Sequence, residues 1–232
     1  MRTRIIYEDN HIIVAHKPAG LATQTARVGQ ADMVSELKNH LAAEQKGQPP
    51  YLGLVHRLDQ PVEGLLVFGK TKQAAAALTK QLGEGTLNKQ YYAVICGKPP
   101  ADSGELVDYL YKDVVKEGKA VVVTGQQHKY PEAKKAVLQY RILKELSTEP
   151  AVCLADIHID TGRFHQIRAQ MAYAGFPLLG DGKYGTDESI ALSSERGIRN
   201  VALCAYSLEL IHPTTGKKLS FSVEPEGKAF AL

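Results

Sequence analysis

The order of strand and helix patterns along the chain constrains its fold more than any other feature. Runs that alternate apolar and polar residues, or are wholly apolar, are typical of β-strands, whereas apolar residues spaced by three or four indicate helices. The strand patterns lie at 4–7, 11–16, 65–68, 90–96, 121–124, 137–143, 151–159, 207–211 and 218–223. The helix patterns lie at 32–43, 71–82 and after Gly162. Because helices do not separate successive strands regularly, we expect an α+β fold with a mixed, mostly antiparallel sheet flanked by helices.

Local signals predict how some of these elements begin and end. Thr71 is suited to cap the helix at 71–82, and the four alanines of that helix favour helical structure. Asp160 or Thr161 is expected to cap the helix that follows Gly162. One face of that helix would carry the apolar residues Phe164, Ile167, Met171 and Ala174. A proline and a glycine within 212–217 predict a hairpin between the last two strands.

Composition places the chain among ordinary globular proteins. Of its 232 residues, 44% are hydrophobic and 23% are charged, which excludes long disordered and collagen-like chains. No run of about 18 apolar residues is present, so no membrane-spanning helix is expected. Polar residues at 8–10 interrupt the stretch where a signal peptide needs its apolar core. We therefore expect one domain over residues 1–232, in a monomeric cytoplasmic protein.

The cysteines and histidines show no metal-binding pattern. Cys96, Cys153 and Cys204 lie about fifty residues apart and form no CxxC pair, so buried, reduced thiols are expected. The eight histidines match none of the known zinc spacings. We expect neither a metal nor an organic cofactor.

Positive charge is concentrated in one part of the chain. The 28 basic and 25 acidic residues give a net charge of +3. Residues 112–145 hold eight basic and four acidic side chains, a net of +4, so the rest of the chain carries −1. A locally basic segment suits contact with a phosphate backbone, but the charge pattern alone favours a solvated charged face.

The clearest chemical pattern is the segment LVHRLDQPVEGLLVFG, which places His56, Arg57 and Asp59 between two apolar runs. Pro61 and Gly64 prevent a continuous strand through the segment. Asp59 is therefore expected on a short loop held by strands, where catalytic side chains are common. The alternative is a carboxylate that only stabilises a turn.

Two further segments carry candidate site residues. In DTGRFHQIRAQMAY, His165 and Arg168 are three residues apart and would be neighbours on one helical face. An arginine that points inward needs an anion and would hold a carboxylate ionised, whereas a surface arginine would need none. In KQYYA, a strand would direct Tyr91 and Tyr92 to opposite faces, so that one is buried and the other is available to a ligand.

These three segments together resemble the RluA-type RNA pseudouridine synthases. The motifs are HRLD at 56–59, the Lys-x-Tyr-x-Ala run at 89–93 and GRFHQIR at 162–168. The likeness continues at 7–24, 175–185 and 201–221, and so covers nearly the whole chain in the family's order. It implies a pseudouridine synthase catalytic domain over residues 1–232. Such enzymes convert a uridine within RNA, here in structured ribosomal or transfer RNA, into pseudouridine.

The resemblance also implies roles for individual residues. Asp59 is the catalytic carboxylate, which attacks ribose C1′, attacks the base or removes the 2′-hydrogen of the ribose. A carboxylate close to a developing oxocarbenium ion has a parallel in glycoside hydrolysis. Tyr91 packs on the target base and is the base for the C5 proton. Arg168 pairs with the carboxylate of Asp59.

Four more residues are expected to bind the substrate. By resemblance, Ile167 lies near the target base, and Arg57 enters the RNA stack when the uridine flips out, because the target atoms are otherwise stacked. His56 and His165 are also expected to bind substrate.

The chain departs from the family's pattern in three places. Pro61-Val62-Glu63-Gly64 stands where Thr-Ser-Gly often ends the first motif, and Phe164 stands where threonine is common. The catalytic pattern begins by residue 5, so the N-terminal RNA-binding domain of many relatives is expected to be absent. Two alternatives remain at this stage. One is a retaining glycosidase with Asp59 and Glu63 as its carboxylates, and the other is an inactive RNA-binding module.

Overall fold

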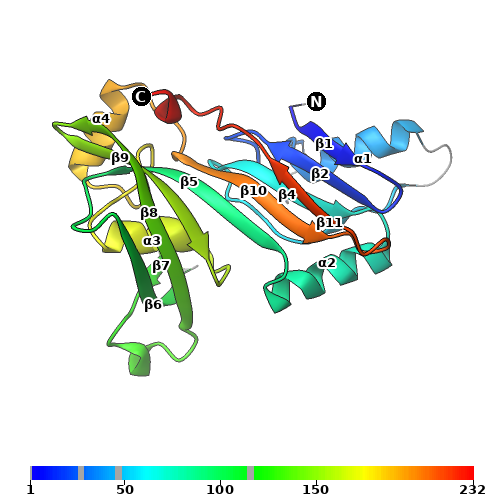
Figure 1. Cartoon of the computed structure of the whole chain (residues 1–232), viewed down its shortest axis with the longest axis horizontal. Helices are drawn as coiled ribbons and strands as arrows, with labels where there is room; N and C mark the ends of the chain where they lie inside the picture. The colour runs from blue at the N-terminus through cyan, green and yellow to red at the C-terminus, as the bar shows by residue number, and fades with distance from the viewer. Residues whose placement is uncertain (1, 26–28, 45–48, 114–117) are drawn as a thin grey trace. The chain divides into compact units, whose positions relative to one another are not determined.

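The computed structural model describes residues 2–25, 29–44, 49–113 and 118–232 (Figure 1). The chain divides into two compact units. Unit 1 comprises Met1–Lys89 and Cys204–Glu226, and unit 2 comprises Gln90–Leu203 and Gly227–Leu232. Within the described ranges, no helix is long and apolar enough to cross a membrane. The single domain expected over residues 1–232 stays a prediction.

The sheet of unit 1 is mixed. Its strands are β1 (Arg4–Glu8), β2 (Ile12–Lys17), β3 (Gly53–Leu54), β4 (Glu63–Gly69), β10 (Leu203–Ile211) and β11 (Lys218–Ser222). β2 pairs with β1 and β4, β3 pairs with β4, and β10 pairs with β11, all antiparallel. β4 and β10 run parallel. Every residue of β2 and β4 is buried, which explains why their sequences are nearly continuous apolar runs.

The helices of unit 1 are α1 (Met33–Glu44) and α2 (Lys72–Glu84). Both were expected, α1 from its apolar spacing and α2 from Thr71 as its N-cap and from its four alanines. As predicted, Thr71 caps α2, because its hydroxyl accepts a hydrogen bond of 3.1 Å from the Ala74 N–H. α2 packs against β4, the strand that directly follows the Asp59 loop.

The sheet of unit 2 is antiparallel throughout. Its strands pair in the order β5-β9-β8-β6-β7. They are β5 (Asn88–Cys96), β6 (Ser103–Asp113), β7 (Lys119–Val122), β8 (Lys134–Thr148) and β9 (Ala151–Ile159). Its helices are α3 (Gln166–Tyr173) and α4 (Asp187–Glu195), with short 3-10 turns η1 (Gln127–Lys129) and η2 (Lys228–Ala231). The predicted α+β fold with a mixed, mostly antiparallel sheet is therefore confirmed, as is the buried, unpaired state of the three cysteines.

The helix after Gly162 differs from its prediction in two ways. It begins at Gln166 with His165 at the N-cap, so the expected capping by Asp160 or Thr161 was wrong. The expected apolar face was also wrong, because Phe164 precedes the helix and is exposed, whereas six consecutive residues from Gln166 to Met171 are buried. α3 contacts β6, β7 and β8, and its six consecutive buried residues leave it without the polar face that a surface helix would have.

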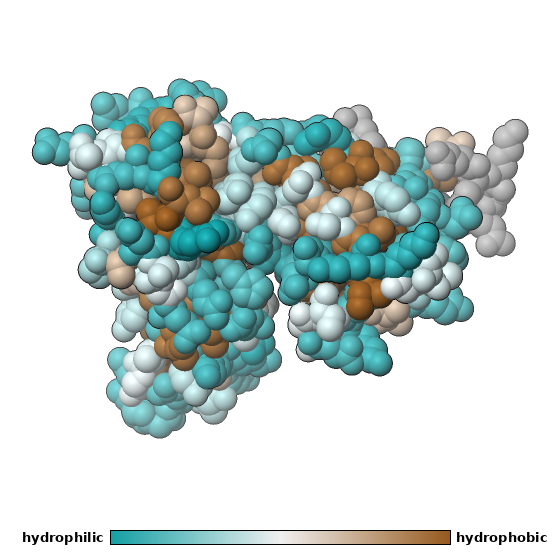
Figure 2. Space-filling model, in the orientation of Figure 1, coloured by the Kyte–Doolittle hydropathy of each residue, from teal (hydrophilic) through white to brown (hydrophobic). Residues whose placement is uncertain are grey.

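One strand and one α-helix of unit 2 have no counterpart in the sequence analysis, and a second strand is longer than expected. β6 and α4 were not predicted, and β8 extends well beyond 137–143. All three expose much of their length, so their sequences lack a strong apolar period. In the view of Figure 2, the surface is largely hydrophilic, with separate hydrophobic patches.

Candidate active site

Asp59 lies on the short loop that connects β3 to β4 in unit 1. The loop closes with a hydrogen bond of 3.1 Å from the Val62 N–H to the Asp59 carbonyl oxygen. The hydroxyl of Thr23 fixes the preceding residue, since it donates to the Leu58 carbonyl oxygen (2.8 Å) and accepts from the Leu58 N–H (3.2 Å). Leu58 and Thr23 are buried, Asp59 is half-buried and Arg57 is exposed. The loop thus holds a partly accessible carboxylate in a fixed position.

His56 lies inside unit 1, beneath this loop. It is buried, and its Nε2 accepts a hydrogen bond of 3.3 Å from the Val67 N–H of β4. Burial, and to a lesser extent the charge of Lys89, holds the pKa of His56 well below its ordinary value. A neutral imidazole in this position joins the loop to β4, and contact of His56 with RNA stays a prediction.

Lys17, which the sequence analysis did not single out, lies under the same loop. Its side chain is fully buried, and Nζ donates to the carbonyl oxygens of Pro18 (3.1 Å), Leu21 (2.7 Å) and Gln60 (3.1 Å). Burial lowers the pKa of Lys17 to about 7, although the carboxylates of Asp59 and Glu63 oppose this shift. In the sequence, Lys17 could have been recognised because it ends an apolar strand directly before a Pro-Ala-Gly turn.

Tyr91 and Tyr92 are neighbours on β5, in unit 2. In the antiparallel pairing with β9, Tyr91 lies opposite Ile157 and Tyr92 opposite Asp156. Tyr91 is buried and Tyr92 is half-buried, so the predicted division of the two tyrosines between opposite faces is confirmed. The motif assigns the functional role to the buried one.

Arg168, on α3 of unit 2, points inward. Its Nε and Nη2 donate to the two carboxylate oxygens of Asp181, at 2.7 and 2.8 Å, and both side chains are buried. One oxygen of Asp181 also accepts from the backbone N–H groups of Lys183 (3.0 Å) and Tyr184 (3.2 Å). The surface-arginine alternative is therefore wrong. The pairing of Arg168 with Asp59, which lies in unit 1, stays a prediction.

Tyr184 connects Arg168 to His165. The guanidinium carbon of Arg168 lies 5.1 Å from the centre of the Tyr184 ring, and the Tyr184 hydroxyl lies 2.8 Å from His165 Nδ1. That hydroxyl also accepts from the Ala120 N–H of β7. His165 has a φ of +50° and stacks on Phe164, while Ile167 is buried. The sequence analysis did not single out Asp181 and Tyr184. Both lie in the segment GFPLLGDGKYG, and the resemblance of that segment to the family could have pointed to them.

Each of the two units carries candidate catalytic groups. Unit 1 provides a carboxylate on a clamped loop, and unit 2 provides a phenol and a guanidinium with a fixed orientation. These are groups suited to covalent and general acid–base catalysis on an organic substrate. Within the described part of the chain, only His16, Glu63 and Glu226, all of unit 1, bring three potential metal ligands together.

Comparisons with known proteins agree on one family. The family model for RNA pseudouridylate synthase matches residues 11–173. The ribosomal large subunit pseudouridine synthase D of Zymomonas mobilis is 33% identical over 229 residues, covering 95% of this chain and 68% of the relative. The enzyme of the same name from Nitrosomonas europaea is 34% identical over 219 residues, covering 93% of this chain. The chain spans only 60% of that second relative's length.

A solved structure supports the fold. Human RNA pseudouridylate synthase domain containing 4 superposes with a TM-score of 0.73 at 24% sequence identity, and the match covers 96% of this chain and 89% of that one. At this identity the likeness concerns the fold alone. It shows that the arrangement of strands and helices found in this chain is that of a pseudouridylate synthase domain.

Proposed function

Because this chain belongs to the RNA pseudouridylate synthase family, we propose that it isomerises a uridine of ribosomal large-subunit RNA to pseudouridine. The observation that supports this proposal most is the family match over residues 11–173. That range includes the Asp59 loop, Tyr91 and the Arg168 helix. The choice of RNA follows the names of two relatives, both ribosomal large subunit pseudouridine synthases. Transfer RNA is the second candidate substrate.

In the proposed reaction, Asp59 acts on the ribose or on the base. The bond between uracil N1 and ribose C1′ breaks, the base turns, and C5 bonds to C1′. The proton on C5 must then leave, with the hydroxyl oxygen of Tyr91 as its acceptor, and N1 gains a proton, so that the overall change is an isomerisation. Arg168 orients the carboxylate of Asp59, and its own bidentate contact with Asp181 holds the guanidinium in place for this.

Substrate binding is proposed to require base flipping. The uracil leaves the RNA stack, and exposed Arg57 fills the vacated space from the loop that carries Asp59. Buried Ile167 packs near the base. His165, fixed by Tyr184, contacts the RNA, and His56 supports the loop from below.

The glycosidase alternative gains no support from the site. Its second carboxylate, Glu63, is buried, and Oε2 of Glu63 accepts a hydrogen bond of 3.0 Å from the Glu226 N–H. A carboxylate that serves a glycosidase must reach an incoming sugar, and Glu63 is directed into unit 1 instead.

The test is a map of pseudouridine in total RNA from cells with and without this gene. We expect a site in large-subunit ribosomal RNA to disappear in the deletion and to return with the wild-type gene. Asp59→Asn should fail to restore it, while Asp102→Asn, a change at an exposed carboxylate, should restore it. Loss of sites only in transfer RNA would contradict the proposed substrate. An unchanged map would contradict the proposed activity.

Purified protein separates chemistry from binding. Asp59→Asn should abolish formation of pseudouridine on a large-subunit RNA fragment while leaving RNA affinity and the melting temperature close to those of the wild type, because the change removes one charge and little volume. Turnover near the wild-type rate would show that Asp59 is not the catalytic group.

A further inference from the structure

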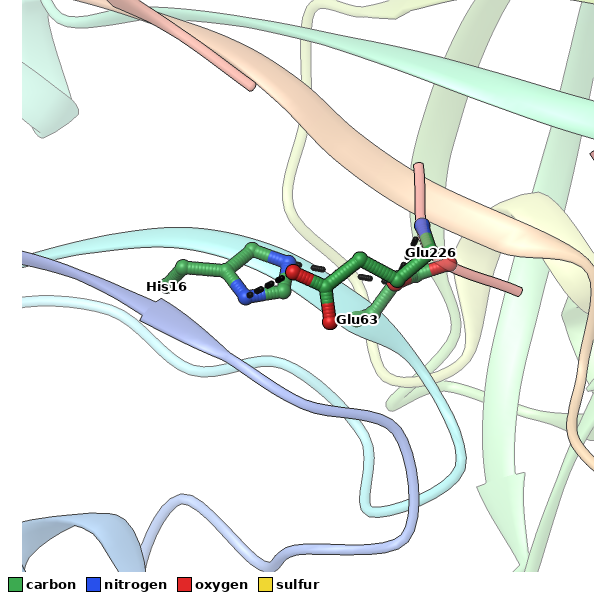
Figure 3. Close-up of side chains that lie close together, drawn as sticks. All are labelled: His16, Glu63 and Glu226. Carbon is green, nitrogen blue, oxygen red and sulfur yellow. Dashed lines mark hydrogen bonds and ion pairs between the residues drawn. The ribbon is translucent and has the colours of Figure 1, made fainter. Parts of the chain in front are cut away.

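Three potential metal ligands from distant parts of the sequence meet in unit 1. His16 is on β2, Glu63 begins β4, and Glu226 lies on the C-terminal tail that follows β11 (Figure 3). In the β2–β4 register His16 lies opposite Leu65, so Glu63 is its diagonal neighbour on the same face. His16 Nε2 is 3.8 Å from Glu63 Oε2, and His16 Nδ1 is 3.8 Å from Glu226 Oε1. One ligand atom from each residue lies within 4.8 Å of the other two.

The imidazole of His16 is buried and incompletely paired. Its side chain is 2% exposed, and Nε2 has no hydrogen-bond partner. Native proteins rarely leave a buried polar atom unpaired, since doing so has a free-energy cost. The unpaired Nε2 offers the lone pair that metal coordination requires.

We propose that His16, Glu63 and Glu226 bind a divalent transition-metal ion, with zinc the ion that best fits the ligand set. One imidazole and two carboxylates match the ligands of known zinc sites, whereas magnesium and calcium prefer oxygen alone. Zinc lies about 2.0–2.2 Å from such ligands, which places tetrahedral ligand atoms roughly 3.3 Å apart. The two separations of 3.8 Å involve different nitrogens of the His16 ring, and an ion takes only one of them. Ligand atoms that now lie within 4.8 Å of one another must therefore close to this spacing. The Glu226 side chain is 56% exposed and lies on the tail, so it is free to make this movement.

Neighbouring cations do not occupy the site. Arg4 pairs with Glu226 Oε1 at 3.2 Å, but both side chains are more than half exposed, and such pairs are weak. Lys17 Nζ is bound to three backbone carbonyl oxygens. A metal would replace the Arg4 contact and neutralise the two carboxylates.

The proposed ion would connect β2, β4 and the C-terminal tail. Glu63 is only four residues beyond Asp59, so the ion would also fix the far end of the Asp59 loop. Glu63 belongs to the Val62-Glu63 pair that departs from the family's usual Thr-Ser, which makes the site a property of this chain. The proposal does not depend on the proposed RNA substrate.

The test uses the full chain, stripped with a chelator and titrated with zinc by calorimetry and with cobalt by its visible absorption. We expect one equivalent to bind, with the spectrum of a four-coordinate site and a rise in melting temperature. Two substitutions should each weaken zinc binding by at least tenfold: Glu63→Gln, and Glu226→Gln at an exposed position. Glu224→Gln, an exposed change on the same tail, should leave binding unchanged.

A second control addresses zinc bound elsewhere. The rings of His11 and His212 lie 5.9 Å apart and form the obvious competing pair. His11→Gln should not affect the single equivalent. The proposal is overturned if the wild type binds neither metal, if Glu226→Gln and Glu63→Gln bind as the wild type does, or if binding is lost in His11→Gln.

Discussion

At the scale of single residues, the site depends on where one hydroxyl and one guanidinium lie. Tyr91 and Tyr92 differ in burial although they are adjacent, and Arg168 is held by both oxygens of Asp181. A substitution that removes only the hydroxyl of Tyr91, or only the planar guanidinium of Arg168, can therefore separate a chemical role from a positioning role.

Tyr91→Phe should bind RNA with the affinity of the wild type but fail to release pseudouridine. The ring still packs against the base, whereas the hydroxyl that accepts the C5 proton is gone. Product formation and RNA binding are measured separately on one RNA fragment. Tyr92→Phe, on the opposite face of β5, is the matched control and should turn over normally. If Tyr92→Phe is the inactive variant, the roles of the two tyrosines are reversed.

Arg168→Lys should lower the rate of isomerisation by about 100-fold or more, although the positive charge is kept. A lysine ammonium cannot make the two parallel contacts that orient a planar guanidinium on Asp181. Single-turnover rates provide the measurement, and thermal melting checks that the fold is intact. Arg163→Lys, an exposed change just before α3, should keep the wild-type rate. Equal rates for both variants would show that the guanidinium plane is not needed.

At the scale of elements, the carboxylate of Asp9 holds the turn between β1 and β2 together through hydrogen bonds. Asp9 Oδ1 accepts hydrogen bonds from the N–H groups of His11 (2.7 Å) and Ile12 (2.9 Å). Its Oδ2 contacts the Tyr7 hydroxyl (2.9 Å) and His212 Nε2 (2.7 Å). Partial burial alone would raise the pKa of Asp9, but these hydrogen bonds outweigh burial and lower the pKa to about 2.

Asp9→Asn should destabilise the protein at neutral pH, and the loss should shrink as the pH falls from about 4 to about 2. The folded pKa is about 2 and the ordinary value is 3.8, so the ionised carboxylate stabilises the fold above that range and loses its contribution as it is protonated. Because the Asp9 side chain is 28% exposed, we expect the free energy of unfolding at neutral pH to fall by roughly 1–2 kcal/mol. Urea unfolding at a series of pH values measures the difference in unfolding free energy between the wild type and Asp9→Asn. Asp102→Asn is the control. A difference that is independent of pH would exclude this role.

At the scale of the whole molecule, charge bears on how RNA is bound. Lys129, Lys134 and Lys135 lie in the basic segment 112–145 and are exposed. Residues 114–117 of that segment lie outside the described residues. A net charge of only +3 implies few phosphate contacts, so the proposed recognition would also use the shape of a folded RNA and its flipped base.

Changing Lys129, Lys134 and Lys135 together to Glu should weaken RNA binding and reduce its salt dependence. Each lost phosphate contact lowers the slope of log affinity against log salt by about one, so a fall of roughly two to three is expected. The same triple change at the exposed lysines Lys38, Lys72 and Lys80 of unit 1 alters net charge equally and is the control. An equal loss in both variants would show that only net charge matters. Unchanged binding in the first variant would show that the segment is a solvated face.

The sequence alone determined much of the secondary structure and the family. The β1–β2 pair, the Thr71 cap and the final hairpin follow from residues within a few positions of one another, because turn and cap preferences and apolar periods are local properties. The three motifs also identified the family. Where apolar patterning is weak, as in β6 and α4, the local signal was insufficient.

Only the tertiary structure decided which polar groups are buried and what they contact. The partners are far apart in the sequence: Lys17 contacts Gln60 43 positions away, and Glu63 contacts Glu226 163 positions away. Asp181 as the partner of Arg168, and the burial of α3 along six consecutive residues, likewise depend on how distant segments pack. Local preferences cannot specify such contacts, since burial and charge pairing are set by the elements that surround a side chain after the chain has folded.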